Sequence, residues 1–345
     1  MKHQNHKKRK IRKQVLQSLV LTLTILILLE GSLGILEMTN SLPEPYEWGS
    51  RQIISWKINE CRKLFSQPEH KNKIKVVIVG DSKPQVSFDP HFMDNYFNNI
   101  TISYNLGFRG IGMRMYSILI QDLIIPKISP DLLVWELNTH DFVDENFTNH
   151  DENFSLTSPM GRYYYQYTEG LDFEGLLEYY LLKYSRIYRY RSIILPSFLY
   201  FDSVTLSDIK TYEETYDRGF LRRWGKYNGS QPLKIRNMTI QRKFLEEGES
   251  LFFQTKNAIE AHNISLLIVH GAYRHLKVTY PRFDAILNTL NFDNFLDLNG
   301  NETFLDNGLY SPDGKHLNHL GAKVYTSFVC KKLTKWMHVP INSKK

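Results

Sequence analysis

Three side chains in this sequence have the types and the order that nucleophilic attack on an ester requires. Ser82 lies directly after Gly80 and Asp81. Far along the chain, Asp313 and His316 are three residues apart in a loop that precedes the last apolar helical pattern. A serine nucleophile needs a base to take its proton and an acid to orient that base. The sequence therefore predicts Ser82 as the nucleophile, His316 as the base and Asp313 as the orienting acid.

The residues before Ser82 predict the element that positions it. Residues 74–79 form a short, apolar, β-branched run that is typical of a buried strand in a parallel sheet. Ligand sites lie at the carboxyl ends of such strands, so a serine just after this one is well placed to meet a substrate. Pro84 stands where a Gly-x-Ser-x-Gly elbow has its last glycine, which argues against an α/β-hydrolase.

The apolar periodicity of the chain predicts an α/β fold with a parallel central sheet. Strands are predicted at residues 74–79, 100–104, 131–137, 264–269 and 295–298. Helices are predicted at residues 50–66, 113–125, 238–262, 280–290 and 322–336. Pro126 is expected to end the second of these helices. Strands that alternate with covering helices are typical of a parallel sheet enclosed on both faces.

Residues 142–235 interrupt this alternation. About 90 residues between consecutive strands exceed an ordinary connection, so we predict an insertion that covers the strand ends. It contains four tyrosines between residues 163 and 167, and helical spacing over residues 173–190. These aromatic side chains either stack on sugar rings, or pack within the insertion and face a membrane surface.

The net charge of +7 comes from the first residues of the chain. Seven of the 43 basic residues precede the first acidic one, Glu30, and the remaining chain carries 36 basic and 36 acidic residues. A nucleic-acid-binding face needs clustered positive charge on the folded part, so nucleic acid is not an expected partner. The 12 histidines include no zinc-type spacing, and no glycine-rich loop follows a dinucleotide or phosphate fingerprint. We therefore expect neither a metal nor a cofactor.

Residues 15–36 form an almost unbroken apolar segment directly after the basic residues 1–14. About 20 apolar residues span a bilayer, and a basic flank stays in the cytoplasm. A cleaved signal peptide is the alternative, but no Ala-x-Ala-like site follows, since the first alanine is Ala258. We favour a single-pass signal anchor in the cell membrane, followed by a stalk and first helix at residues 37–72. The domain at residues 73–340 is then extracytoplasmic.

Two further features bear on that location. Seven Asn-x-Ser/Thr sequons follow the apolar segment, at Asn99, Asn146, Asn153, Asn228, Asn237, Asn263 and Asn301. Their number suggests glycosylation at the cell surface, although a chain rich in asparagine inflates such a count. Cys61 and Cys330 either form one disulfide or remain two buried thiols, and the sequence leaves both open.

Three motifs at these positions resemble those of the SGNH/GDSL hydrolase family. They are Gly80-Asp81-Ser82, residues 105–110 (Asn-Leu-Gly-Phe-Arg-Gly) and residues 313–318 (Asp-Gly-Lys-His-Leu-Asn). The resemblance implies a flavodoxin-like three-layer sandwich, and the same nucleophile, base and orienting acid. It also implies that the backbone N–H groups of Ser82 and Gly110 bind the oxyanion.

One position departs from the family pattern. The family usually ends its third strand with Gly-x-Asn-Asp, in which the asparagine is a third oxyanion donor. The aligned residues here are Asn138, Thr139, His140 and Asp141, so His140 occupies the asparagine position. Either a ring N–H of His140 or the amide of Asn138 is expected to replace it. Loss of one oxyanion donor lowers the rate roughly 10²- to 10³-fold, so turnover depends on this replacement.

A looser resemblance narrows the expected function. Residues 88–90 (Phe-Asp-Pro) and 133–137 (Leu-Val-Trp-Glu-Leu), with the first two motifs, are similar to membrane-anchored SGNH-like proteins of surface-polymer acylation. This implies a serine esterase or acyltransferase that acts on O-acyl groups of surface glycans or polymers beside a membrane-bound O-acyltransferase. The alternative is a non-catalytic SGNH-like accessory or glycan-binding protein.

Overall fold

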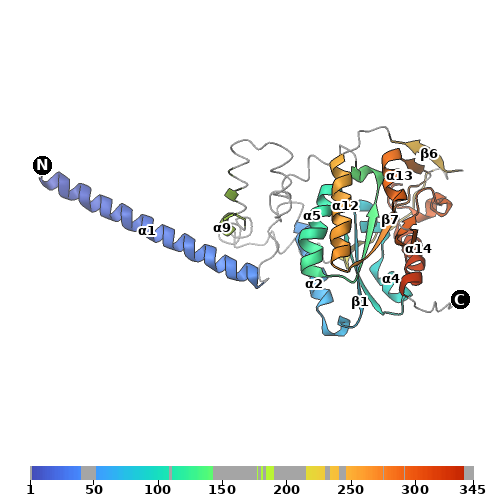
Figure 1. Cartoon of the computed structure of the whole chain (residues 1–345), viewed down its shortest axis with the longest axis horizontal. Coiled ribbons are helices and arrows are strands. Elements are labelled where there is room, and N and C mark those ends of the chain that lie inside the picture. The colour runs from blue at the N-terminus through green and yellow to red at the C-terminus, as the bar shows by residue number, and fades with distance from the viewer. Residues whose placement is uncertain are drawn as a thin grey trace.

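The computed structural model describes residues 2–39, 52–108, 111–142, 177, 180–181, 184–189, 215–229, 234–240, 246–274, 276–290 and 292–337. The described part consists of a long N-terminal helix, α1 (Lys2–Met38), and an α/β body that runs from α2 (Gln52–Phe65) to α14 (His319–Met337). Helix α1 extends away from the α/β body (Figure 1).

The body is built on a five-stranded parallel sheet with the order β2-β1-β3-β7-β9. The strands are β1 (Ile74–Gly80), β2 (Thr101–Gly107), β3 (Leu132–Leu137), β7 (Ser265–His270) and β9 (Phe295–Asp297). This is the 2-1-3-4-5 order of doubly wound, flavodoxin-like sheets, in which β1 and β3 flank the switch point. The five predicted strands are confirmed. Strand β2 runs three residues further than predicted, which places Asn105 and Gly107 in the strand.

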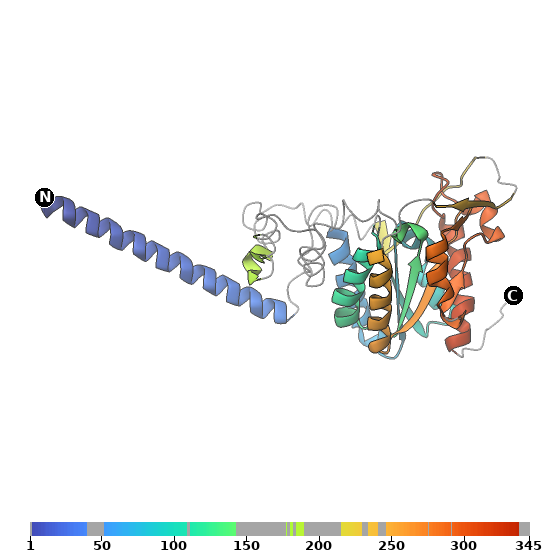
Figure 2. The same cartoon turned by 45° about the horizontal axis from the view of Figure 1, so that its top comes forward.

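Helices cover both faces of the sheet, so the body has three layers (Figures 1 and 2). One face packs against α2, α5 (Met113–Ile118), η3 (Leu119–Ile128), α12 (Glu246–Ala261) and α13 (Pro281–Asn288). The opposite face packs against α4 (Pro90–Tyr96) and α14.

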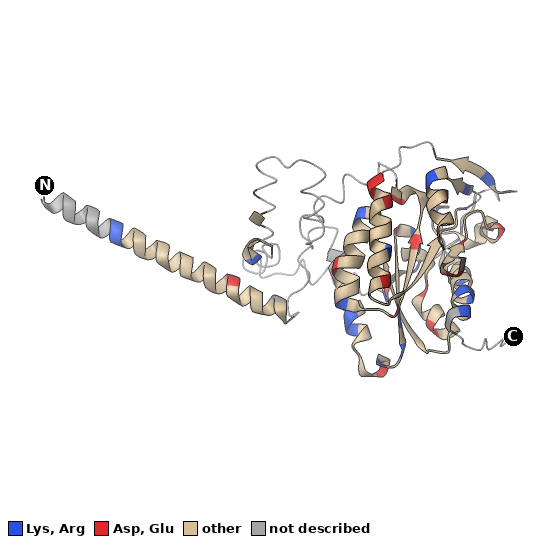
Figure 3. Cartoon of the chain, viewed as in Figure 1, with Lys and Arg blue, Asp and Glu red and all other residues tan. Residues whose placement is uncertain are grey.

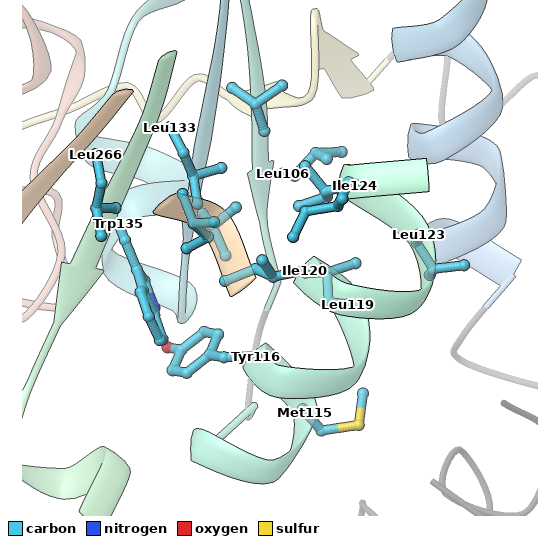
Figure 4. Close-up of a cluster of buried hydrophobic side chains, with 14 of the residues drawn as sticks. Leu106, Met115, Tyr116, Leu119, Ile120, Leu123, Ile124, Leu133, Trp135 and Leu266 are labelled. Carbon is cyan, nitrogen blue, oxygen red and sulfur yellow. The ribbon is translucent and has the colours of Figure 1, made fainter. Parts of the chain in front are cut away.

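Alternation along β1 explains the two cores. Val77 and Val79 belong to the first core, whereas Val76 and Ile78 belong to the second. Successive side chains of a strand point to opposite faces, so an unbroken apolar strand has to be covered on both sides. The first core is shown in Figure 4, where Trp135 of β3 meets Tyr116 of α5 with ring centroids 5.8 Å apart.

Two predicted helix boundaries are wrong. Pro126 does not end its helix, because it lies inside η3, which has π-helical geometry and continues to Ile128. The wider turn of a π-helix shifts the hydrogen-bond ladder, which lets a residue without an N–H fit. The N–H of Ser129 closes this helix by donating to the carbonyl of Ile124, five residues back, at 2.9 Å.

The helix predicted at 238–262 begins later, at Glu246 in α12. The residues before it form β6 (Arg236–Thr239), which pairs in parallel with β8 (Leu276–Thr279) in a separate two-stranded sheet. Three glutamates in the first turn of α12 favour a helix start there, because negative charge stabilises a helix N-terminus. Strand β6 was missed because its partner strand lies far along the chain.

The predicted membrane segment is helical. Residues 12–36 of α1 form one continuous helix that is long and apolar enough to cross a membrane. Glu30 is the one charged side chain between residues 14 and 36 (Figure 3). The same length and composition also fit a signal sequence.

Glu30, in the C-terminal half of this helix, has a specific contact. Its carboxylate accepts hydrogen bonds from the backbone N–H groups of Arg186 and Ile187 and from the hydroxyl of Ser185. These residues lie at the start of α9 (Arg186–Arg189), within the predicted insertion. The insertion therefore contacts the apolar helix where its acidic residue lies.

Most of the predicted insertion, including much of the helix expected at 173–190, lies outside the described residues. Its described end contains the hairpin β4 (Tyr216–Asp217) and β5 (Phe220–Leu221). The carbonyl of Arg218, in the turn of this hairpin, accepts from the N–H of Asn105 in β2 at 2.9 Å. This end of the insertion thus packs on the edge strand of the sheet.

The two cysteines do not pair. Cys61 and Cys330 are both free and buried. Cys61 belongs to the core on one face of the sheet and Cys330 to the core on the other. The structure therefore selects buried thiols over the disulfide.

Candidate active site

Ser82 lies at the carboxyl end of β1, as predicted. Strand β1 ends at Gly80, Asp81 is the N-cap residue, and Ser82 is the first residue of α3 (Ser82–Ser87). The Asp81 carboxylate accepts from the N–H of Lys83 at 2.7 Å, which fixes the first turn of α3. A Cβ on Gly80 would lie 2.1 Å from Cγ of Pro84, so the sharp strand-to-helix turn requires glycine.

The structure brings Ser82, His316 and Asp313 together. Nε2 of His316 lies 3.3 Å from Oγ of Ser82, a residue 234 positions away in the chain. Nδ1 of His316 lies 2.9 Å from Oδ2 of Asp313. The first contact is slightly longer than the usual range of about 2.6–3.2 Å for a nucleophile and its base. The arrangement is that of a nucleophile, a base and an acid that orients the base.

The Asp313 carboxylate is held in place by its own loop. Its Oδ1 atom accepts from the Ser311 hydroxyl at 2.8 Å and from the backbone N–H groups of Lys315 and His316 at 2.9 and 3.0 Å. Partial burial acts to raise the pKa of Asp313, but these hydrogen bonds outweigh it and hold the pKa below its usual range. Asp313 is therefore ionised and only accepts. Nδ1 of His316 must then donate, which leaves Nε2 to accept from Ser82.

Arg223 is a site residue that sequence analysis missed. Its guanidinium donates to Oδ2 of Asp313 at 2.5 Å, on the same oxygen that His316 contacts. Arg223 lies shortly after β5, at the described end of the insertion. No local motif marks it, because it lies 90 residues before Asp313.

Asn105 and Gly107 of the second motif hold α3 against the sheet. The Asn105 amide donates to the carbonyls of Pro84 at 2.8 Å and Phe88 at 2.9 Å, and its oxygen accepts from the N–H of Gly107 at 2.8 Å. A Cβ on Gly107 would lie only 2.5 Å from the backbone nitrogen of Gln85. These two residues therefore position Ser82 from a distance. Gly110 lies outside the described residues, so its role as an oxyanion donor stays a prediction.

The Asn138 side chain, one of the two candidates for the third oxyanion donor, contacts Lys83 and Glu136. It is fully buried after the end of β3. Its oxygen accepts from Nζ of Lys83 at 3.2 Å, and its amide nitrogen is 3.4 Å from Oε1 of Glu136. His140 lies in the short helix η4 (Thr139–Phe142), half-buried, with its ring edge-on to Tyr273 at 6.4 Å between centroids.

Lys83, directly after Ser82, belongs to a polar cluster with Asn138, Glu136 and Asp141. Its ammonium lies 3.1 Å from the centre of the Tyr273 ring, close enough for a cation–π contact. Burial lowers the pKa of Lys83, and the charges of Asp81, Glu136 and Asp141 partly offset that effect. The hydroxyl of Tyr273 is buried and has no hydrogen-bond partner in the described part of the chain.

The pKa values of Glu136 and Asp141 in this cluster are raised, whereas the pKa of Asp313 is lowered. Burial and the charge of Asp81 raise the pKa of Glu136 to about 8, although the hydroxyl of Tyr325 donates to it at 2.6 Å. Burial likewise raises the pKa of Asp141, whose Oδ2 accepts from the N–H of Asn138 at 2.7 Å. Glu136 is therefore largely neutral at neutral pH, and the cluster carries less negative charge than its composition suggests.

The described residues contain no group of three or more His, Cys, Asp or Glu side chains that could hold a metal ion. No protein-family model matches the chain, and no curated protein matches it either.

Proposed function

We propose that this protein is a membrane-anchored serine esterase or acyltransferase of the SGNH/GDSL type. We further propose that it acts outside the cytoplasm on O-acyl groups of surface glycans or polymers. The observation that carries the proposal is the chain of contacts from Ser82 through His316 to Asp313. The strand order and the placement of Ser82 after β1 support it.

The first half-reaction transfers the acyl group to Ser82. Its Oγ attacks the ester carbonyl while Nε2 of His316 takes the hydroxyl proton. The N–H groups of Ser82 and Gly110 would stabilise the negative oxygen of the tetrahedral intermediate, as the family resemblance implies. His316 then returns the proton to the departing alcohol, and an acyl ester of Ser82 remains.

The second half-reaction frees Ser82. A second hydroxyl attacks the acyl ester while His316 takes its proton, and Ser82 leaves with a proton from the same imidazole. If that hydroxyl is water, the protein is an esterase. If it belongs to a sugar or polymer, the protein is an acyltransferase. The insertion borders the site through Arg223 and Asp313, so it is in a position to favour one acceptor over the other.

The apolar helix at residues 12–36 supports a single-pass anchor with the N-terminus in the cytoplasm. Such an anchor would hold the site near the membrane surface. A membrane-bound O-acyltransferase that supplies or receives the acyl group is the partner that fits this arrangement.

A second candidate is a non-catalytic SGNH-like accessory or glycan-binding protein. The observation that favours it is the amide of Asn138, which is engaged with Lys83 and Glu136. If His140 also fails to donate, the oxyanion lacks its third donor, and a loss of roughly 10²- to 10³-fold follows.

Hydrolysis of a short-chain aryl ester tests the proposal. We expect Asp313→Asn to lower kcat by about 10⁴-fold, because the base then loses its correct tautomer. His316→Ala should abolish the same activity. The matched control is His262→Ala, since this exposed histidine contacts only the backbone of its own helix end among the described residues. Equal rates for wild type and His316→Ala would exclude His316 as the base.

A further inference from the structure

Trp224 is an exposed aromatic residue beside the site. Its side chain is 64% exposed, which is unusual for a tryptophan. It follows Arg223, whose guanidinium contacts Asp313. Tryptophan rings supply large contact areas at binding interfaces, and this one lies next in the chain to a residue of the candidate active site.

The ring is held in place. It packs against the imidazole of His319, with centroids 4.5 Å apart and planes tilted by 41°. The guanidinium of Arg222 lies 5.7 Å from the centre of the ring, within range of a cation–π contact. A ring held on these sides loses little conformational entropy when a ligand binds.

The backbone around Trp224 is tied to the loop that carries the base. The N–H of His319 donates to the carbonyl of Arg223 at 2.9 Å, and the Asn318 amide donates to the carbonyl of Gly225 at 2.9 Å. Gly225 has a φ of +88°, and a Cβ there would lie 3.1 Å from Cγ of Pro312. This turn therefore needs glycine, and the backbone on both sides of Trp224 is held against the loop that contains His316.

We propose that Trp224 is the stacking platform of a subsite that binds a sugar ring of the substrate next to Ser82 and His316. The choice of ligand rests on the proposed function. The C–H face of a sugar ring matches the flat apolar face of an indole, and its hydroxyls would meet the donors of Arg222. A cationic ligand does not fit, because the guanidinium of Arg222 already lies beside the ring. A sugar bound there would bring its O-acyl group towards Ser82.

Binding can be measured without turnover. The protein for this experiment is the full chain with the substitution Ser82→Ala, solubilised in detergent. It is titrated with chito- and xylo-oligosaccharides, each with and without O-acetyl groups. Adding Trp224→Ala should lower affinity by about tenfold or more, the usual loss when a tryptophan anchor is truncated. Trp224→Phe should retain part of the affinity. The matched control is Leu320→Ala, a neighbouring side chain that is 41% exposed.

Three results would overturn the inference. The first is an equal affinity for the oligosaccharides with and without Trp224→Ala. The second is that the Ser82→Ala protein binds none of these oligosaccharides. The third is that Trp224→Ala lowers the affinity for lipid vesicles and leaves the affinity for oligosaccharides unchanged. Thermal unfolding of each variant separates a binding defect from a folding defect. Because the assay needs no chemistry at Ser82, its failure is distinguishable from failure of the proposed activity.

Discussion

The surroundings of Asp313 and of Glu136 shift the pKa values of these two carboxyl groups in opposite directions. Asp313 is partly exposed and accepts hydrogen bonds from its own loop, and these keep its pKa low. Glu136 is fully buried with Asp81 nearby, so its pKa rises to about 8. Catalytic sites often contain two acids whose pKa values differ in this way, so that one acid stays charged while the other stays neutral. Only Asp313 can orient His316 as an anion.

The neutral state of Glu136 predicts a pH-dependent stability. The folded protein holds this proton up to about pH 8, whereas an unfolded chain releases it near pH 4.5. The unfolded state therefore binds fewer protons in this window, and stability should fall as pH rises from about 4.5 to 8. In Glu136→Gln this fall should be smaller, though not absent, since Asp141 contributes in the same direction.

Thermal unfolding of the two proteins at pH 5 and pH 8 measures this difference. The exposed Glu302→Gln serves as the matched control and should behave as wild type. An identical fall in all three proteins would show that Glu136 does not carry a raised pKa.

At the level of elements, the contact between β2 and α3 determines where Ser82 lies. Asn105 and Gly107 bring the strand close to the backbone of α3, and both belong to the same motif. The motif thus acts on Ser82 through packing and hydrogen bonds across two elements.

Gly107→Ala should disrupt this contact. The added methyl group would meet backbone atoms of Gln85, which cannot rotate away as a side chain can. We expect a loss of about 1–3 kcal/mol in unfolding free energy, typical of an overpacked interior, together with reduced ester hydrolysis. Gly248→Ala is the control, because its nearest neighbour would lie at an ordinary 3.4 Å. If the two variants are equally stable and active, the close approach at Gly107 is unimportant.

The elements also show what local sequence can predict. β1 and β3 were predictable because each is a short run with a single charged residue among apolar ones, and buried parallel strands are largely apolar. Ser82, Asp313 and His316 were predictable because each lies at a recognisable end of an element. Strand β6 was not, since its pairing with β8 depends on residues about 40 positions away. Arg223 and the contact between Lys83 and Asn138 were missed for the same reason.

On the scale of the whole molecule, the excess of positive charge and the long apolar segment both lie at the N-terminal end of the chain. Residues 12–36 can cross a membrane, and the remaining chain is close to neutral. Of the sequons in the described residues, Asn99, Asn228, Asn237 and Asn263 are exposed on the body. Their exposure makes them accessible to glycosylation, as an extracytoplasmic location would require.

Membrane extraction tests the anchor. The full chain should remain in the membrane pellet after alkaline carbonate treatment, because about 20 buried apolar residues hold a helix in a bilayer. N-terminal sequencing of the mature protein should show that the chain begins before residue 36, so that the apolar segment is retained. Release into the supernatant, or a mature chain that begins after residue 36, would instead establish a cleaved signal peptide.

The most direct test of the central claim is covalent labelling of Ser82. A fluorophosphonate reacts with a serine that a neighbouring base activates, and it needs no knowledge of the natural substrate. We predict an adduct on Ser82 in the folded full chain, no adduct in Ser82→Ala, and strongly slowed labelling in His316→Ala. Absence of an adduct on Ser82 in well-folded wild-type protein would contradict the assignment of this residue as a nucleophile.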